Sequence, residues 1–189
     1  MRTTILITLL NLLILSVFSQ NKIPCVIETA MGKIAIELYP EKAPKTVANF
    51  LNYVDGKLYD GTTFFRVCTP ENEKDRTIKI QVIQGGEVPE SMQFDPVQME
   101  TTKQTGLRHV NGTVSMARDA PNSATCSFFI CMGDQPELDF AGKRNPDGQG
   151  FAAFGKVTKG MKVVRRIQAQ KEKDQRLLNP VKIILIRRL

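Results

Sequence analysis

The side chains that most often perform acid–base, nucleophilic or metal chemistry are scarce in this 189-residue chain. His109 is the only histidine. This excludes a zinc site with two histidine ligands and leaves a Ser-His-Asp triad one candidate base. Ser115 stands in the stretch 113–117, which reads TVSMA and lacks the G-x-S-x-G elbow of serine hydrolases. We therefore interpret His109 as a structural hydrogen-bonding residue.

The loop 133–150 contains glycine, proline and acidic residues in patterns that only partly match known ligand sites. Gly142-Lys143 is not part of a phosphate-binding loop, because Glu137 stands where the first glycine of that motif belongs. The Asp and Asn residues of this loop lack the spacing of an EF-hand calcium site, so turn formation explains them better than calcium binding. We predict no metal site here, and we interpret this segment as a long functional or capping loop.

Four cysteines, Cys25, Cys68, Cys126 and Cys131, allow three complete disulfide pairings, and the sequence does not choose among them. Cys126 and Cys131 lie in an apolar run that is typical of a strand. Their odd spacing places them on opposite faces of that strand, so they cannot hold one metal together. We interpret all four as small buried hydrophobic residues rather than as disulfides or reactive thiols.

Local patterns predict two helices and many short strands that must position any functional residue. Pro44 opens one helix with apolar residues at 47, 50, 51 and 54, and Gly56 ends it. The spacing of Met161, Val164 and Ile167 indicates the second helix. Strands are predicted at 25–29, 33–38, 62–67, 78–84, 112–117, 127–132, 151–155 and 181–186.

The arrangement of these elements predicts one mainly β domain. The polar stretch 69–76 is expected to be a surface loop, and a turn at 30–32 joins the first two strands. No internal repeat or low-complexity linker divides the chain. Many short strands with two helices favour a closed antiparallel barrel, which also leaves no unpaired strand edge.

Several short motifs follow one another in a specific order. They are Ile27-Glu28-Thr29, Gly32-Lys33-Ile34, Glu37-Leu38-Tyr39-Pro40, Ala43-Pro44-Lys45-Thr46-Val47-Ala48-Asn49-Phe50, Tyr59-Asp60-Gly61, Phe64-Phe65-Arg66-Val67, Gln84-Gly85-Gly86, Ser115-Met116-Ala117, Pro121-Asn122-Ser123, Phe128-Phe129-Ile130, Phe154-Gly155-Lys156-Val157 and Gly160-Met161. In this order, over roughly 25–186, the chain resembles a bacterial-type cyclophilin. The resemblance implies an eight-stranded antiparallel β-barrel capped by two α-helices, peptidyl-prolyl cis/trans isomerase activity and no cofactor.

The chemistry of that reaction explains why so few acid–base groups are needed. Amide resonance opposes rotation about the C–N bond with a barrier of about 18–20 kcal/mol, but no bond has to break. A catalyst must hold the proline ring and favour the twisted amide, for example by donating a hydrogen bond to the prolyl nitrogen. A guanidinium group, which is always protonated, suits this role. The resemblance implies that Arg66 is the catalytic residue.

The resemblance also implies the residues of the substrate groove. Phe129 is expected to be a wall of the proline pocket, and Gln84 to orient the arginine and the substrate. The remaining predicted groove residues are Val82, Leu138, Ala117, Arg118, Gln81, Ser127 and Phe151. Gln81 stands where the family often has phenylalanine and Ser127 where it usually has glutamine, which predicts a less apolar pocket and slower turnover. Without the resemblance, Arg66 would be interpreted as a surface salt-bridge partner.

Residues 1–19 have the pattern of an export signal. Arg2 precedes the mainly apolar run 5–18, and a small residue, Ser19, stands before Gln20. The apolar run is shorter than the roughly 20 residues of a membrane-spanning helix, so cleavage is favoured over a membrane anchor. We therefore expect a signal peptide at 1–19, an exported monomeric domain at 20–189 in the periplasm or secreted, and no stable membrane insertion after cleavage.

Two other functions remain open alongside an isomerase that acts on proline-containing polypeptides. The first is a proline-peptide binding module with weak catalysis. The second is a basic protein that binds nucleic acid or an anionic surface, since the net charge is +7. It would use the cluster Lys162, Arg165, Arg166, Lys171, Lys173 and Arg176. A solvated helix face explains that cluster better, because no aromatic residues interleave to stack on bases. We predict no nucleic-acid partner.

Overall fold

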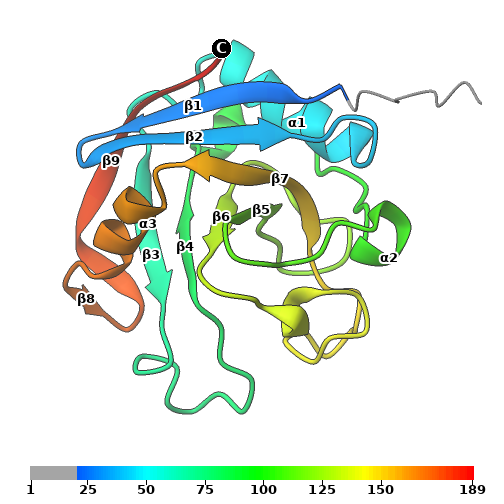
Figure 1. Cartoon of the computed structure of the whole chain (residues 1–189), viewed down its shortest axis with the longest axis vertical. Helices are drawn as coiled ribbons and strands as arrows, with labels where there is room; N and C mark the ends of the chain where they lie inside the picture. The colour runs from blue at the N-terminus through cyan, green and yellow to red at the C-terminus, as the bar shows by residue number, and fades with distance from the viewer. Residues whose placement is uncertain (1–20) are drawn as a thin grey trace, which may run out of the picture.

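The computed structural model describes residues 21–189, so the predicted signal peptide at 1–19 lies outside the described residues. Eight antiparallel strands close into a barrel (Figure 1). They are β1 (Ile23–Thr29), β2 (Gly32–Leu38), β3 (Thr63–Cys68), β4 (Val82–Gly85), β5 (Thr113–Met116), β6 (Phe128–Cys131), β7 (Ala152–Lys159) and β9 (Arg176–Arg188).

The strands follow the order β1-β2-β7-β5-β6-β4-β3-β9, and β9 pairs with β1 to close the ring. A two-residue strand, β8 (Glu172–Lys173), pairs only with β9 and lies outside the ring. Closure leaves the eight main strands without an unpaired edge, which was the physical reason for predicting a barrel. The predicted fold class is therefore confirmed.

The first hairpin shows how side-chain alternation specifies the barrel wall. In β2, Ile34, Ile36 and Leu38 are buried, while the residues between them are at least partly exposed. The register pairs Ile27 with Ile34 and Thr29 with Gly32. Because alternate residues of a strand face opposite sides of a sheet, these isoleucines point into the barrel together.

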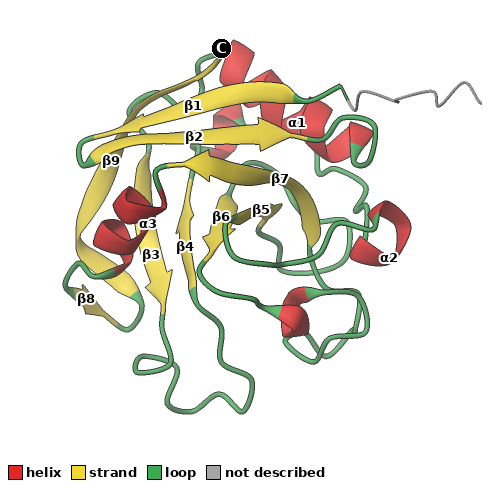
Figure 2. Cartoon of the chain, in the orientation of Figure 1, coloured by secondary structure: helices red, strands yellow, loops and turns green. Residues whose placement is uncertain are grey.

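Both predicted helices are present, and three shorter helices were not predicted (Figure 2). Helix α1 (Pro44–Asp55) buries the apolar face that its spacing predicted, and α3 (Met161–Gln168) buries Val164 and Ile167. In Figure 1, α1 lies behind the β1–β2 hairpin and α3 beside β3. The short helices are η1 (Glu90–Met92), α2 (Thr102–Thr105) and η2 (Pro136–Leu138).

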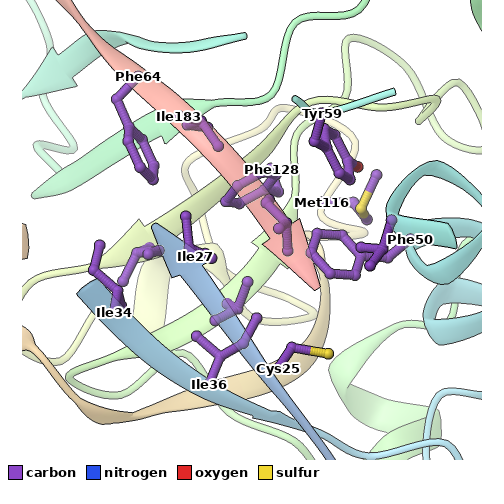
Figure 3. Packing of buried hydrophobic residues seen from close by; sticks show 14 of the residues in the cluster. Cys25, Ile27, Ile34, Ile36, Phe50, Tyr59, Phe64, Met116, Phe128 and Ile183 are labelled. Carbon is purple, nitrogen blue, oxygen red and sulfur yellow. The ribbon is translucent and has the colours of Figure 1, made fainter. Parts of the chain in front are cut away.

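The main core fills the barrel and the space beneath α1 with aromatic and branched side chains (Figure 3). The Phe128 ring meets the Phe50 ring edge-on, with centroids 5.5 Å apart, and meets the Tyr59 ring at the same distance. The Tyr59 hydroxyl donates a hydrogen bond of 2.7 Å to the Cys126 carbonyl oxygen, so its polar atom is satisfied.

A second, smaller apolar cluster is separate from the main core. Its buried members are Cys68, Ile80, Val82, Phe129, Cys131 and Leu138, with Ala117 and Phe151 packed against them. Strand alternation explains the division, because residues on one face of a strand fill the barrel and their neighbours face outward. This second cluster forms the apolar part of the candidate site.

All four cysteines are free and buried, as the sequence indicated. Cys126 belongs to the main core and Cys131 to the smaller cluster, which places them on opposite sides of the sheet. Burial raises the pKa of the Cys25 and Cys68 thiols to about 11.

The segment before β4 departs from the sequence predictions in two places. The strand predicted at 78–84 begins only at Val82, because the preceding backbone bonds to side chains instead of to a strand. The Ile80 N–H donates to Glu73 Oε2 at 2.8 Å, and the Gln81 N–H donates to Gln135 Oε1 at 3.2 Å. The polar stretch 69–76 is also not wholly a surface loop, since Glu73 is buried.

Strands β7 and β9 also extend beyond the ranges predicted for them, 151–155 and 181–186. Among residues 21–189, no helix has both the length and the apolar character needed to cross a membrane.

Candidate active site

A groove of about 640 Å³ lies over the smaller apolar cluster. Nine of the ten site residues predicted from the sequence line this groove, although they come from β3, β4, β6, η2 and the loops around them. They are Arg66, Val82, Gln84, Ala117, Arg118, Ser127, Phe129, Leu138 and Phe151. Gln81 is not among the described residues that line it.

Strand register explains why the principal residues meet. Arg66 of β3 pairs with Gln84 of β4, and Gln84 pairs with Phe129 of β6. Directly paired residues of neighbouring strands point to the same face of a sheet. The three side chains therefore form a row across three strands, with the guanidinium at one end and the aromatic ring at the other.

The Arg66 guanidinium is held by two glutamine side chains. Nη1 donates to Gln84 Oε1 at 2.8 Å, while Nε and Nη2 donate to Gln175 Oε1 at 3.0 Å and 2.5 Å. A guanidinium has five N–H donors. These three bonds leave two N–H groups of Arg66 without an acceptor among residues 21–189, at a half-buried position that lines the groove.

The apolar end of the site is a pocket built around two aromatic rings. Phe129 packs edge-on against Phe151, with ring centroids 5.4 Å apart and an interplanar angle of 88°. Leu138 and Val82 are buried beside them. These side chains offer apolar surface for a small ring, while Ser127 contributes the polar rim position that its type predicted.

His109 supports this pocket from behind. Its ring stacks on Phe129 with centroids 5.9 Å apart and planes 17° from parallel. One ring nitrogen, Nδ1, lies 2.7 Å from Asp139 Oδ1 and the other, Nε2, lies 2.9 Å from Ser115 Oγ. Burial alone would raise the pKa of Asp139, but hydrogen bonds from the His109 side chain and backbone lower it.

This order of serine, histidine and aspartate resembles a hydrolase triad in connectivity only. The Ser115 hydroxyl is completely buried and His109 is 1% exposed, so a substrate carbonyl cannot reach the oxygen. A nucleophile must be accessible to the group it attacks. The structural role predicted for His109 is therefore confirmed. Among the described residues, no group of three or more His, Cys, Asp or Glu side chains is arranged to hold a metal ion.

Arg118 lines the groove, but its guanidinium is committed to the loop 139–150. Nη1 and Nη2 each donate to Asp147 at 2.8 Å, and Nε donates to the Gly150 carbonyl oxygen at 2.8 Å. The hydrogen bonds from Arg118 lower the pKa of Asp147. Arg118 also lies over the Phe151 ring, 5.2 Å from its centroid. It therefore fixes the loop against the pocket.

Gln81 is the one predicted site residue that the structure places elsewhere. Its backbone N–H bonds to the Gln135 side chain, and its carbonyl oxygen accepts from the Met132 N–H at 2.8 Å. The neighbouring Ile80 lines the groove instead and is 6% exposed. Ile80, in the irregular backbone before β4, therefore supplies an apolar side chain to the pocket, although the family often has its apolar residue at the position of Gln81.

Sequence reasoning missed several groove residues and one neighbour of Arg66. Gln175 lies in the turn between β8 and β9, and no motif marked it as a partner of Arg66. The missed lining residues are Phe65, Arg76, Ile80, Glu87, Asp119, Ser123, Thr125, Arg144, Asn145 and Arg176. Most of them lie on loops, where no periodic pattern indicates which side chains face inward.

Comparison with known proteins agrees with this geometry. Residues 25–188 match the family described as cyclophilin type peptidyl-prolyl cis-trans isomerase/CLD. The chain is 42% identical over 155 residues to the peptidyl-prolyl cis-trans isomerase cyp18 of Streptomyces antibioticus, covering 79% of this chain and 86% of that protein. It is 37% identical over 145 residues to peptidyl-prolyl cis-trans isomerase B of Escherichia coli (strain K12), covering 74% and 80%.

The fold is also found in a crystal structure of a Cryptosporidium parvum cyclophilin type peptidyl-prolyl cis-trans isomerase. The TM-score is 0.69 at 23% identity, and the match covers 89% of this chain and 98% of that one. The barrel, the row from Arg66 to Phe129 and the extent of the sequence match lead to one conclusion. The chain belongs to the family of cyclophilin-type peptidyl-prolyl cis-trans isomerases.

Proposed function

We propose that this protein is an exported isomerase that accelerates rotation about X-Pro bonds in polypeptides outside the cytoplasm, with Arg66 as the catalytic residue. The observation that carries the proposal is the placement of two Arg66 N–H groups, which have no acceptor among residues 21–189, beside the apolar pocket around Phe129. Two strand spacings separate the two residues, or roughly 10 Å between backbones. That separation leaves room for a proline ring between them.

The proposed mechanism uses the two ends of the row differently. The Phe129 pocket holds the proline ring by burying its apolar surface. As the amide twists, its nitrogen lone pair becomes localised and accepts a hydrogen bond from Arg66. This interaction is stronger in the twisted state than in either planar state, which is the requirement for catalysis. Gln84 holds the guanidinium in place and is itself fixed by the β4 backbone.

The proposal that the protein is exported rests only on the sequence pattern of residues 1–19 and not on any feature of the barrel. We propose cleavage before Gln20, a monomeric mature protein and clients that are proline-containing polypeptides. Expression of the full chain in a Gram-negative host, followed by fractionation and N-terminal sequencing, tests this. A periplasmic protein beginning at Gln20 is the expected result. A cytoplasmic protein with Met1 retained would overturn the proposal for export without affecting the proposal for catalysis.

The catalytic proposal is tested by exchange NMR on a short Ala-Pro-Phe peptide with residues 20–189. Arg66→Ala should reduce the isomerisation rate constant about 100-fold, the usual effect of removing a donor that stabilises a transition state. Arg188→Ala is the matched control, because Arg188 pairs with Asp55 and does not line the groove. Unchanged acceleration by a folded Arg66→Ala protein would refute the role of Arg66. Peptide binding without acceleration by the unmodified protein would instead identify a proline-peptide binding module.

A further inference from the structure

A buried ion pair joins the loops before β4 and after η2 at the edge of the groove. The Glu73 side chain has no exposed surface and that of Arg144 is 7% exposed. Arg144 Nη1 donates to Glu73 Oε2 at 2.9 Å, and Nη2 donates to Glu73 Oε1. Arg144 Nη1 also donates to the Ile78 carbonyl oxygen at 2.6 Å. The two loops, which are far apart in sequence, are therefore connected by charge-assisted hydrogen bonds.

The stability of the fold alone is a weak explanation for this pair. Removing two charges from water costs free energy that their mutual attraction offsets only when the remaining hydrogen bonds are also made. Apolar residues of similar size often serve a fold as well or better. Besides Arg144, the Glu73 carboxylate accepts hydrogen bonds from two groups. One is the Ile80 N–H, a backbone contact that holds the loop, and the other is the Gln175 side chain, which leads to the candidate site.

Gln175 connects the Glu73 carboxylate to Arg66. The Gln175 side-chain Nε2 donates to Glu73 Oε1 at 3.4 Å, while its Oε1 accepts from Nε and Nη2 of Arg66. A carboxylate only accepts hydrogen bonds and a guanidinium only donates them. Only one orientation of the Gln175 amide satisfies both neighbours, and Glu73 selects the orientation that presents the oxygen to Arg66.

The backbone of Gln175 is also fixed, so the amide orientation is the main remaining freedom of this residue. The Gln175 N–H donates to Glu172 Oε2 at 2.6 Å, and its carbonyl oxygen accepts from the Val67 N–H at 2.9 Å. Without Glu73, rotation of the amide would turn its NH₂ group toward the Arg66 donors. The guanidinium would then lose two of its three hydrogen bonds and sample other rotamers.

We propose that the buried Glu73–Arg144 pair is a positioning device for Arg66, which acts by fixing the Gln175 amide. This inference rests on the proposed function, because it takes Arg66 as the catalytic residue. Glu73, Arg144 and Gln175 are positioning residues, since they act through Arg66. The consequence is a guanidinium held from both sides, by Gln84 and by Gln175, with its free N–H groups directed to the substrate. Preorganised donors of this kind need no reorientation during the reaction.

The test removes the pair without leaving a buried charge. Glu73→Leu/Arg144→Met replaces both ions with apolar side chains of similar length, and Gln175→Met removes the amide. Each protein should lose about tenfold in kcat, the effect of losing one hydrogen bond to a charged group. In Gln175→Met, KM should change by less than about twofold, because Gln175 does not line the groove, whereas Arg144 does. Asp55→Leu/Arg188→Met is the matched control, because it removes an arginine–carboxylate pair away from the groove and should leave kcat unchanged.

Combining the changes shows whether they act through one route. The triple variant should be no slower than Gln175→Met alone, because coupled residues are not additive. The ¹⁵Nε resonance of Arg66 should shift in each of the three proteins and not in the control. The inference would be overturned if the losses in kcat multiply in the triple variant. It would also be overturned if Glu73→Leu/Arg144→Met folds with an unchanged kcat and an unchanged Arg66 resonance.

Two further measurements keep the test decisive. If the apolar pair does not fold, Glu73→Gln/Arg144→Met replaces it, because it leaves no buried charge and keeps an acceptor for the Ile80 N–H. The amide at position 73 can donate to or accept from Gln175 and no longer selects one orientation, so the same resonance shift and loss of kcat are expected. An unchanged Arg66 resonance and kcat in that variant would overturn the inference. If Arg66→Ala retains full activity, the proposed function fails, and the Arg66 resonance alone then decides whether Glu73 positions Arg66.

Discussion

Replacement of His109 by leucine should destabilise the protein through buried polar groups rather than through catalysis. The histidine is 1% exposed and bridges Asp139 and Ser115, both through side-chain contacts below 3 Å. Leucine preserves apolar volume but offers neither a donor nor an acceptor. The Ser115 hydroxyl, which is completely buried, would then lack a partner.

The expected cost can be worked out from these contacts. An unsatisfied buried hydroxyl costs about 1–3 kcal/mol, and a lost hydrogen bond to a charged group costs about 1.5–3 kcal/mol. Loss of the stacked contact with Phe129 adds about 0.5–1.5 kcal/mol. Because leucine restores some apolar contact, we expect a net loss of about 3–5 kcal/mol in the free energy of unfolding. For a chain of this size, the melting temperature should fall by about 6–20 °C.

Thermal and urea unfolding followed by circular dichroism measure this change. The double variant His109→Leu/Ser115→Ala should recover about 1–2 kcal/mol, since it removes the unsatisfied hydroxyl as well. A loss below about 1 kcal/mol in His109→Leu, or no recovery in the double variant, would refute the argument that the buried chain of hydrogen bonds supports the pocket.

Three other predictions follow from separate features. Gly86→Ala should lower the free energy of unfolding, measured in urea, by at least about 2 kcal/mol. Gly86 has φ +77°, and a Cβ there would lie 2.7 Å from the Phe128 side chain. A smaller loss would contradict this account of the packing. All four cysteines are buried, so a thiol reagent at pH 7 should label them only after unfolding. Burial also raises the pKa of Cys25 and Cys68 to about 11, which keeps these two thiols protonated. Rapid labelling of the native protein would argue against this. The pKa of Asp139 is lowered in the folded protein, so the ionised carboxylate stabilises the fold above about pH 3.8, and this contribution is lost as the pH falls through the folded-state pKa. Asp139→Asn should therefore make the free energy of unfolding less dependent on pH on the acid side. An unchanged pH dependence would contradict this assignment.

The parts of the fold that were predictable depend on local patterns. The first hairpin and α1 could be located because alternation in the strands and helical spacing in 44–55 repeat over short distances. The start of β4 could not, because in the β-rich run 78–84 the N–H groups of residues 80 and 81 donate to the Glu73 and Gln135 side chains instead of to a strand. Neither partner is adjacent in sequence, so no local pattern announced the competition between strand pairing and side-chain bonding.

The candidate site divides in the same way. Arg66, Gln84 and Phe129 were found because they lie in ordered motifs on strands, and strand register brings them together. Gln175 and the Glu73–Arg144 pair were missed, since each contact joins segments separated by about 70 residues or more. Glu73 looked like an ordinary charged loop residue, and only the folded structure shows that it is buried against an arginine.

This division has a physical consequence for how substitutions should act. The apolar wall of the site is part of the barrel, so changes there alter packing and stability together with substrate binding. The polar side of the site depends on loops whose buried charges contact each other and Gln175 more than the main core. Glu73 and Arg144 also bond the Ile80 N–H and the Ile78 carbonyl oxygen, so replacing them with apolar residues removes two backbone hydrogen bonds as well as the ion pair. Gln175→Met leaves these bonds in place and should therefore separate turnover from folding, whereas substitutions at Phe129 should not.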